Sequence, residues 1–263
     1  MGMENLRRYG RAPFKVAVIH GGPGAPGEMA PVARELSQVT GILEPLQMAT
    51  TVAGQIEELH VLLQENAGLP VTLIGFSWGA MLSFIFAAQH PRLVKKLVLV
   101  SSGPYEEKYA LGITQTRLSR LEGEDRKGAI RLSEALDGPA TAGKNAIMSR
   151  LGELIAKADS YDPMPTDSGP VECQYEVYQG VWEQASELRR SRRLLGLGKG
   201  VRCAVVAIHG DYDPHPAEGV REPLSRILED FRFILLERCG HRPWIERNAR
   251  DEFYRILVQE MRD

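Results

Sequence analysis

Short apolar segments alternate along most of the chain with segments whose apolar residues recur at helical spacing. Runs this short and this apolar suit strands that are covered on both faces, and their alternation with helices predicts right-handed β-α-β crossovers in a parallel sheet. The candidate strands are KVAVIH, ILEP, VTLIGF, LVLVSS, AVVAIHG and FRFILLE. We therefore expect an α/β fold in which helices flank a mostly parallel sheet of about six strands.

The helical pattern is clear in TTVAGQIEELHVLLQENAG, residues 50–68. The apolar residues at helical spacing are Ile56, Leu59, Leu62 and Leu63, and Gly68 is placed to cap the C-terminus of this helix.

The alternation of strands and helices stops between residues 104 and 200. This region has several amphipathic helical patterns and two interruptions rich in proline and glycine, LDGPATAG and YDPMPTDSGP, but no convincing strand. We expect a helical cap at 104–200, inserted into a core formed by 1–103 and 201–263.

One helix of this region is predicted to have two distinct faces. Its apolar stripe, which we expect to be packed, consists of Tyr175, Tyr178, Trp182 and Ala185. Its acidic stripe, which we expect to be solvated, consists of Glu176, Glu183 and Glu187.

The overall composition is that of a soluble globular protein. The 263 residues carry a formal net charge of −2, which gives no reason to expect nucleic acid or an anionic membrane as a partner. The longest apolar stretch is too short to span a bilayer and the N-terminus lacks an apolar signal-peptide core, so we expect a cytoplasmic protein. The 3 cysteines are unclustered and suggest neither a disulfide framework nor a thiolate zinc site.

The segment GFSWG, residues 75–79, matches the G-x-S-x-G pattern of a nucleophile elbow. An apolar strand precedes it and a helical segment follows, which is the context that this turn requires. The glycines permit a sharp turn that projects the Ser77 hydroxyl above the sheet, and the helix N-terminus beneath it can stabilise a developing oxyanion. We predict that Ser77 is a catalytic nucleophile.

A serine nucleophile needs a base to take its proton. His241 lies in ERCGHRPWIE, between the last predicted strand and a terminal helix. That loop is at the carboxyl end of a strand, where sites in parallel sheets gather. The other histidines lie on predicted helices or directly precede glycine at strand ends, or belong to the segment considered next, so we predict His241 as the base.

The segment VVAIHGDYDPHP places His209, Asp211, Asp213 and His215 on every second position. An extended chain would point all four to one face, as a metal site could require. Gly210 and the two prolines interrupt such a strand, however, so we expect no metal here. The segment instead supplies an acid between Ser77 and His241 in the chain, in the order Ser, Asp, His, and we prefer Asp213 to Asp211 for this role.

The segment HGGPG, residues 20–24, ends the first candidate strand. Glycines let the backbone approach a substrate closely, and we predict the Gly22 and Trp78 N–H groups as oxyanion donors. A phosphate-binding loop is the alternative interpretation, but the segment lacks the Lys-Ser/Thr of a P-loop and the third glycine of a dinucleotide fingerprint.

With these four parts in order, the chain resembles the α/β-hydrolase superfamily over nearly its whole length. HGGPG, SWG and CGHRPWIE look like the proline iminopeptidase branch. The resemblance implies a nucleophile at Ser77, an acid at Asp213, a base at His241 and a helical cap between the sixth and seventh strands of the usual fold. It also implies hydrolysis without a cofactor.

Two features depart from that branch. The iminopeptidases usually carry an Asp-Gln-Arg-Gly loop where this chain has ILEPLQMATT, and they have two antiparallel strands before the HGGPG strand, where this chain has only residues 1–15. We expect these N-terminal antiparallel strands to be missing. The acidic cap residues that bind the substrate's amino terminus in the iminopeptidases have four candidate counterparts here, Glu172, Glu176, Glu183 and Glu187.

The leading expectation is a serine hydrolase that cleaves a small-molecule ester, thioester or amide through an acyl-enzyme. An iminopeptidase-like aminopeptidase, a lyase or cofactor-free peroxidase with the same triad, and a ligand-binding protein that keeps the fold remain open. The candidate substrate-binding residues are Tyr105, Glu176, Tyr178 and Trp182. The sequence leaves the substrate and the oligomeric state undetermined.

Overall fold

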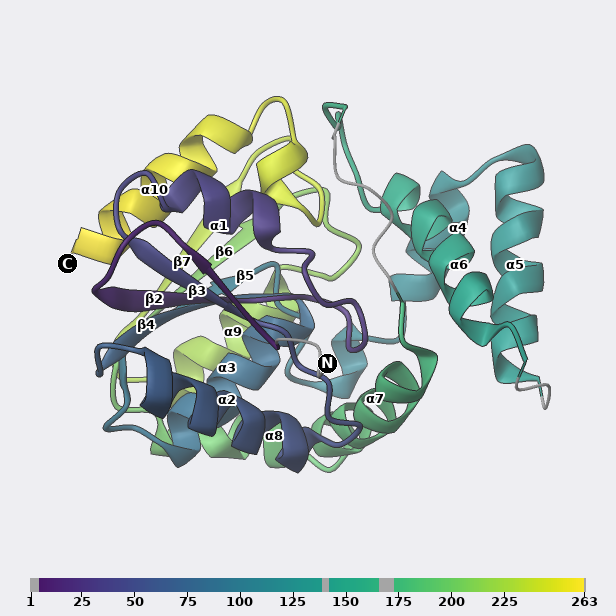
Figure 1. Cartoon of the computed structure of the whole chain (residues 1–263). Helices are drawn as coiled ribbons and strands as arrows, with labels where there is room; N and C mark the ends of the chain where they lie inside the picture. Colours follow the sequence, from purple (N-terminus) through teal and green to yellow (C-terminus); the bar gives the residue numbers. More distant parts are fainter. Residues whose placement is uncertain (1–4, 139–141, 166–172, 263) are drawn as a thin grey trace.

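In a computed structural model, which describes residues 5–138, 142–165 and 173–262, all six segments predicted as strands lie in one sheet. The described sheet has seven strands in the order β1-β3-β2-β4-β5-β6-β7 (Figure 1). The strands are β1 (Leu6–Tyr9), β2 (Phe14–Ile19), β3 (Gly41–Pro45), β4 (Val71–Phe76), β5 (Val94–Val100), β6 (Ala204–Gly210) and β7 (Phe231–Leu236).

The strands β2 to β7 pair in parallel, as predicted, but β1 adds an antiparallel edge. Leu6 pairs with Pro45 and Tyr9 with Ile42. The expectation that the N-terminal antiparallel strands are missing is therefore wrong for one strand. The sequence LRRY of β1 is polar and gave no strand signal, because an edge strand that buries only Leu6 needs no apolar run.

The parallel strands are apolar throughout because helices cover both faces of the sheet. On β5, Leu97 and Leu99 face one hydrophobic cluster, while Val98 and Val100 face the other. The first cluster lies against α2 (Val52–Asn66), α3 (Trp78–Gln89) and α9 (Glu218–Ile227), and the second against α1 (Ala30–Leu36) and α10 (Arg250–Arg262) (Figure 1).

The helix α2 forms where its pattern predicts it. The Thr51 hydroxyl caps its N-terminus by accepting the Gly54 N–H at 3.0 Å. At its C-terminus the cap is Ala67, in an extended conformation, and not Gly68 as predicted. The Gly68 N–H instead donates to the Phe14 carbonyl at 2.8 Å, so contact with β2 and not a left-handed cap ends the helix.

Between β5 and β6 the described residues form helices and no strand, apart from one isolated bridge between Pro163 and Glu246. Figure 1 shows α4, α5 and α6 gathered on one side of the molecule, with α7 between them and the helices of the core. The elements of this region are η1 (Glu107–Tyr109), α4 (Ile113–Arg120), α5 (Gly123–Asp137), α6 (Lys144–Ala158), α7 (Tyr175–Arg190), α8 (Arg193–Gly196) and η2 (Leu197–Gly200).

The buried face of α7 shares only Ala185 with the predicted apolar stripe. It consists of Val177, Val181, Ala185 and Arg189. Tyr175, Tyr178 and Trp182 are only half-buried, and the Tyr178 and Trp182 rings stack with their centroids 6.2 Å apart. A Cβ on Gly180 would lie 2.3 Å from the Thr50 carbonyl oxygen, so the helix passes close to the backbone at this point. The acidic stripe is exposed, as predicted.

None of the helices in the described part of the chain combines the length and the apolar character that crossing a bilayer requires.

Candidate active site

Ser77 lies at the sharp turn between β4 and α3, with φ 51° and ψ −113°. Few residues other than glycine adopt a positive φ, so this backbone conformation is strained and must be held by its surroundings. The Ser77 N–H donates to the Val100 carbonyl at 2.9 Å, which ties the turn to the neighbouring strand. The turn has the strand-turn-helix form that the sequence predicts for a nucleophile elbow.

The two glycines of the motif are required by close backbone contacts. A Cβ on Gly75 would lie 2.3 Å from the Gly79 carbonyl oxygen, and a Cβ on Gly79 would lie 2.3 Å from the Ile19 carbonyl oxygen. Neither contact is possible for a real side chain. The glycines therefore let α3 begin directly against the ends of β2 and β4 and hold Ser77 at the edge of the sheet.

His241 and Asp213 are brought together by the loops that follow β7 and β6. The His241 Nδ1–H donates to Asp213 Oδ2 at 2.7 Å, and the His241 ring packs on Phe76, with centroids 4.8 Å apart. Phe76 is the neighbour of Ser77, so the imidazole lies next to the serine turn. Within the described residues, neither Ser77 Oγ nor His241 Nε2 has a hydrogen-bond partner, which leaves both atoms free for a substrate.

Burial and charge act in opposite directions on this pair. Burial raises the pKa of Asp213, but the imidazoles of His241, His215 and His209 outweigh it and hold the pKa well below its usual range. Burial lowers the pKa of His241, and the Asp213 carboxylate outweighs it, so that the pKa of His241 is raised. The arrangement thus stabilises an imidazolium at His241.

Asp211 has a different environment. Its carboxylate accepts the Cys239 N–H at 3.1 Å and supports the loop that precedes His241. Asp213, and not Asp211, is the acid whose carboxylate accepts the His241 Nδ1–H.

The histidines of the same segment also reach Asp213. His215 donates both its backbone N–H and its Nδ1–H to Asp213 Oδ1, at 2.9 and 2.8 Å, and His209 Nε2 lies 3.5 Å from Asp213 Oδ2. One ligand atom each from Asp213, His215 and His241 lies within 4.8 Å of the others, which is a spacing that a metal ion could use. Both Nδ1 atoms are, however, already committed to hydrogen bonds with the carboxylate.

The HGGPG loop is anchored by a buried, neutral histidine. Burial lowers the pKa of His20 to about 4. The His20 Nδ1–H donates to the Gly21 carbonyl at 2.8 Å, and Nε2 accepts the Gln47 N–H at 3.3 Å. Only the neutral imidazole can make both bonds, so His20 joins this loop to the chain that follows β3.

The predicted oxyanion donors, the backbone N–H groups of Gly22 and Trp78, form no hydrogen bond among the described residues. The Trp78 indole is itself fixed by donating to Gln55 Oε1 at 2.8 Å. Both N–H groups thus remain available for a bound oxyanion.

Glu246 fastens the His241 loop to the segment that follows α6. Its fully buried carboxylate accepts the N–H groups of Gly240, Tyr161 and Asp162 at 3.1, 2.9 and 2.8 Å. The His241 N–H donates to the Asp159 carbonyl at 2.8 Å, at the end of α6. The position of His241 therefore depends on residues of the helical region between β5 and β6.

The four candidate substrate-binding residues differ in burial and in packing. Tyr105 is fully buried in the core and packs edge-on against Phe84, so it does not line an open site. Glu176 is exposed on α7. Tyr178 and Trp182 are half-buried and stacked, and Tyr178 is close enough to Arg117 for the guanidinium to lower its pKa, although burial raises it more. Of the other acidic cap candidates, Glu183 and Glu187 are exposed and Glu172 lies outside the described residues.

Sequence reasoning missed Glu28, which lies between the HGGPG loop and α1. Its carboxylate touches the position that a Cβ on Gly21 would occupy, 2.7 Å from Oε2. Burial raises the pKa of Glu28, and the nearby Arg242 and His241 act in the opposite direction without cancelling it. Among the described residues Glu28 has no hydrogen bond or ion pair. No motif marks this residue, because only folding brings it within electrostatic reach of His241.

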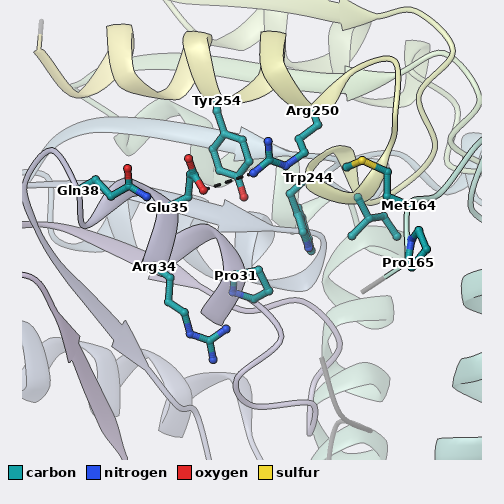
Figure 2. Close-up of a pocket in the computed structure, with 10 residues that line it drawn as sticks. Pro31, Arg34, Glu35, Gln38, Met164, Pro165, Trp244, Arg250 and Tyr254 are labelled. Atoms are coloured by element: carbon teal, nitrogen blue, oxygen red, sulfur yellow. Dashed lines mark hydrogen bonds and ion pairs between the residues drawn. The ribbon is translucent and has the colours of Figure 1, made fainter. Parts of the chain in front are cut away.

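A separate cavity of about 350 Å³ lies between α1, α10 and the 164–165 segment (Figure 2). The residues that line it are Pro31, Arg34, Glu35, Gln38, Met164, Pro165, Trp244, Ile245, Arg250 and Tyr254. None of the predicted triad residues is among them. The Trp244 ring packs on Phe76, and Phe76 packs on His241, so an aromatic layer separates this cavity from the site.

The sequence matches a family model described as alpha/beta hydrolase fold over residues 49–246, which is more than half of the chain. The protein therefore belongs to the α/β-hydrolase fold family, the superfamily that its motifs resemble.

Individual known proteins are more distant. The chain is 23% identical over 207 residues to the monoacylglycerol lipase abhd6-B of Xenopus laevis, and the match covers 75% of this chain and 57% of that protein. The chain thus spans little more than half the length of this relative. Among solved structures it is similar to VinJ, with a TM-score of 0.69, 16% identity and coverage of 98% of this chain and 94% of that one. A proline iminopeptidase of Mycobacterium smegmatis gives a TM-score of 0.64, 16% identity and coverage of 98% and 93%. At these identities the structures share the fold.

Proposed function

We propose that this protein is a serine hydrolase that cleaves a small-molecule ester, thioester or amide through an acyl-enzyme, with Ser77, Asp213 and His241 as its triad. The observation that carries the proposal is the strained Ser77 turn next to an imidazole whose Nδ1–H is held by Asp213 at 2.7 Å. That hydrogen bond fixes the tautomer in which Nε2 has a free lone pair.

The reaction follows from these positions. Ser77 Oγ forms a bond to the substrate carbonyl carbon while its proton passes to His241 Nε2, and the Gly22 and Trp78 N–H groups bind the oxyanion. The tetrahedral intermediate collapses as the bond to the leaving group breaks and His241 returns its proton to that group. A water molecule then attacks the acyl-enzyme and gives its proton to His241, which restores Ser77. We also propose that the helices at 104–200 form the cap that selects the substrate.

The proposal is tested by labelling with a fluorophosphonate probe, which reacts only with an activated serine. We expect the wild-type protein to be labelled and the Ser77→Ala and His241→Gln variants to lose labelling. Ser83→Ala, a change at another serine of α3, is the matched control and keeps it. A wild-type protein that resists the probe would overturn the proposal and would favour a ligand-binding protein. Product analysis on p-nitrophenyl esters distinguishes hydrolysis from lyase or peroxidase chemistry.

A second candidate function, aminopeptidase activity, is favoured by Glu28. Its carboxylate is within electrostatic reach of His241 and Arg242, and burial outweighs both, so a substrate ammonium group would add a positive charge that further stabilises the carboxylate. This candidate uses the same triad on an aminoacyl substrate.

The two candidates predict different substrate preferences. If Glu28 binds an ammonium group, Glu28→Gln raises KM for alanine and proline anilides by a larger factor than KM for p-nitrophenyl acetate, which has no ammonium group. Glu134→Gln, an exposed change on α5, is the control and alters neither. Equal KM values for Glu28→Gln and wild type on the anilides would rule out this role of Glu28.

A further inference from the structure

The carboxylate of Asp213 is shared between two imidazoles. Oδ2 accepts the His241 Nδ1–H at 2.7 Å, and Oδ1 accepts the His215 Nδ1–H at 2.8 Å. The two rings lie side by side, with centroids 4.6 Å apart and planes inclined by 32°. All three residues are nearly or fully inaccessible to solvent.

His215 is itself held in place by His209. The His209 Nε2–H donates to the His215 carbonyl at 2.8 Å, and the His215 backbone N–H donates to Asp213 Oδ1 at 2.9 Å. The backbone N–H binds Oδ1 independently of the ring, so this oxygen keeps one donor when the ring is replaced. The ring N–H of His215 adds a second donor to the same oxygen, and this donor withdraws negative charge from the carboxylate that faces His241.

Resting on the proposed function, we propose that His215 is a positioning residue of the hydrolase. Its imidazole binds Asp213 Oδ1 as a neutral donor and thereby limits how strongly Asp213 holds a proton on His241.

The two imidazoles have opposite tendencies to take up a proton, in agreement with this role. Burial lowers the pKa of His215 to about 4, with the nearby His241 and Arg117 acting in the same direction and Asp213 against it. The pKa of His241 is raised. At neutral pH His215 thus remains a neutral hydrogen-bond donor, while His241 is the ring that can carry the proton.

Charged groups reach this cluster from several elements. Arg117 approaches from α4, Asp159 follows α6, Glu28 precedes α1 and Arg242 follows His241. A change at His215 leaves all of them in place, so a shift in the proton affinity of His241 can be attributed to the lost donor.

The test measures the rate of fluorophosphonate labelling of Ser77 as a function of pH in wild type, His215→Phe and His215→Asn. Phenylalanine keeps a ring but removes the donor, so the negative charge on Asp213 increases and His241 holds its proton more tightly. We expect the acid limb of the profile to move up by about half to one pH unit in His215→Phe. Asparagine places an amide N–H near the position of Nδ1–H and restores the limb to within about 0.3 unit of wild type.

The outcomes separate the inference from the proposed function. If the wild type is not labelled at any pH, the serine hydrolase proposal fails. If the wild type is labelled and His215→Phe lowers the rate equally at every pH without moving the limb, His215 has a packing role only and the inference is overturned. Melting temperatures of both variants, with His60→Asn on the distant helix α2 as control, show whether each remains folded.

Discussion

Arg117 forms a two-point ion pair with Asp159, with Nε and Nη2 donating to the two carboxylate oxygens at 2.8 and 2.7 Å. The pair joins α4 to the residue whose carbonyl oxygen accepts the His241 N–H. The helical region between β5 and β6 and the loop that carries His241 are therefore joined through Asp159, and the Arg117 and Asp159 side chains are mostly removed from water.

Breaking this ion pair from one side should be costly. Arg117→Met leaves the Asp159 carboxylate, which is 3% exposed, without its partner, and we expect the free energy of unfolding to fall by about 3–5 kcal/mol. Urea denaturation measures the change. The double variant Arg117→Met with Asp159→Asn should recover part of the loss. Arg150→Met, which breaks an exposed pair with Glu153, should change stability by less than about 1 kcal/mol.

The hydrogen bonds of Glu246 join the loop that carries His241 to the segment that follows α6, and a substitution at Glu246 tests their contribution. Glu246→Gln replaces one acceptor oxygen with an N–H group that faces backbone N–H donors, and we expect a loss of about 1–3 kcal/mol. Amide exchange should become faster at Tyr161, Asp162 and Gly240, and fluorophosphonate labelling should slow. Glu229→Gln, on an exposed segment, should leave exchange at these sites unchanged. Unaltered exchange in Glu246→Gln would contradict this account.

We expect a glycine-to-alanine substitution to have opposite effects on stability at Gly79 and at Gly152. Gly79→Ala puts a Cβ 2.3 Å from the Ile19 carbonyl oxygen and should destabilise the fold by about 3 kcal/mol or more. Gly152→Ala, in α6, meets no heavy atom within 4 Å and should stabilise by up to about 1 kcal/mol. The melting temperatures of the two variants and the wild type measure these effects. An unchanged melting temperature of Gly79→Ala would mean that α3 can move away from β2.

Because His20 is buried in its neutral form, we expect the free energy of unfolding to fall in mild acid. Its pKa is about 4 in the folded protein and 6.5 in a solvated chain, so between these values the unfolded chain binds a proton that the folded protein excludes. The contribution of His20 to the free energy of unfolding is therefore fully present above pH 6.5. It decreases by about 3 kcal/mol as the pH falls to 4. The difference in unfolding free energy between wild type and His20→Gln, measured from pH 7 to 4, should shrink as the pH falls. A difference that is constant with pH would show that His20 titrates normally.

Much of the candidate site could be predicted because its parts carry local signals. Ser77 is flanked by glycines between a strand and a helix, and His241 and Asp213 each follow an apolar strand in the expected chain order. Glu28, Arg117 and His215 could not be placed in the same way. Each reaches the site through tertiary contacts, and the spacing of His215 from Asp213 fits several loop conformations.

The sequence by itself determined the α/β class, the six parallel strands and the order of the motifs, because burial on both faces forces continuous apolar runs and tight turns force glycine. It did not reveal β1, since an edge strand can be polar. It also placed the packed stripe of α7 on Tyr175, Tyr178 and Trp182, which are half-buried, since aromatic side chains also suit half-exposed positions. Only the tertiary structure decided which acid meets His241 and that a second imidazole binds the same carboxylate. Those contacts depend on how loops from different strands converge, and hydrophobic periodicity along the chain contains no information about that.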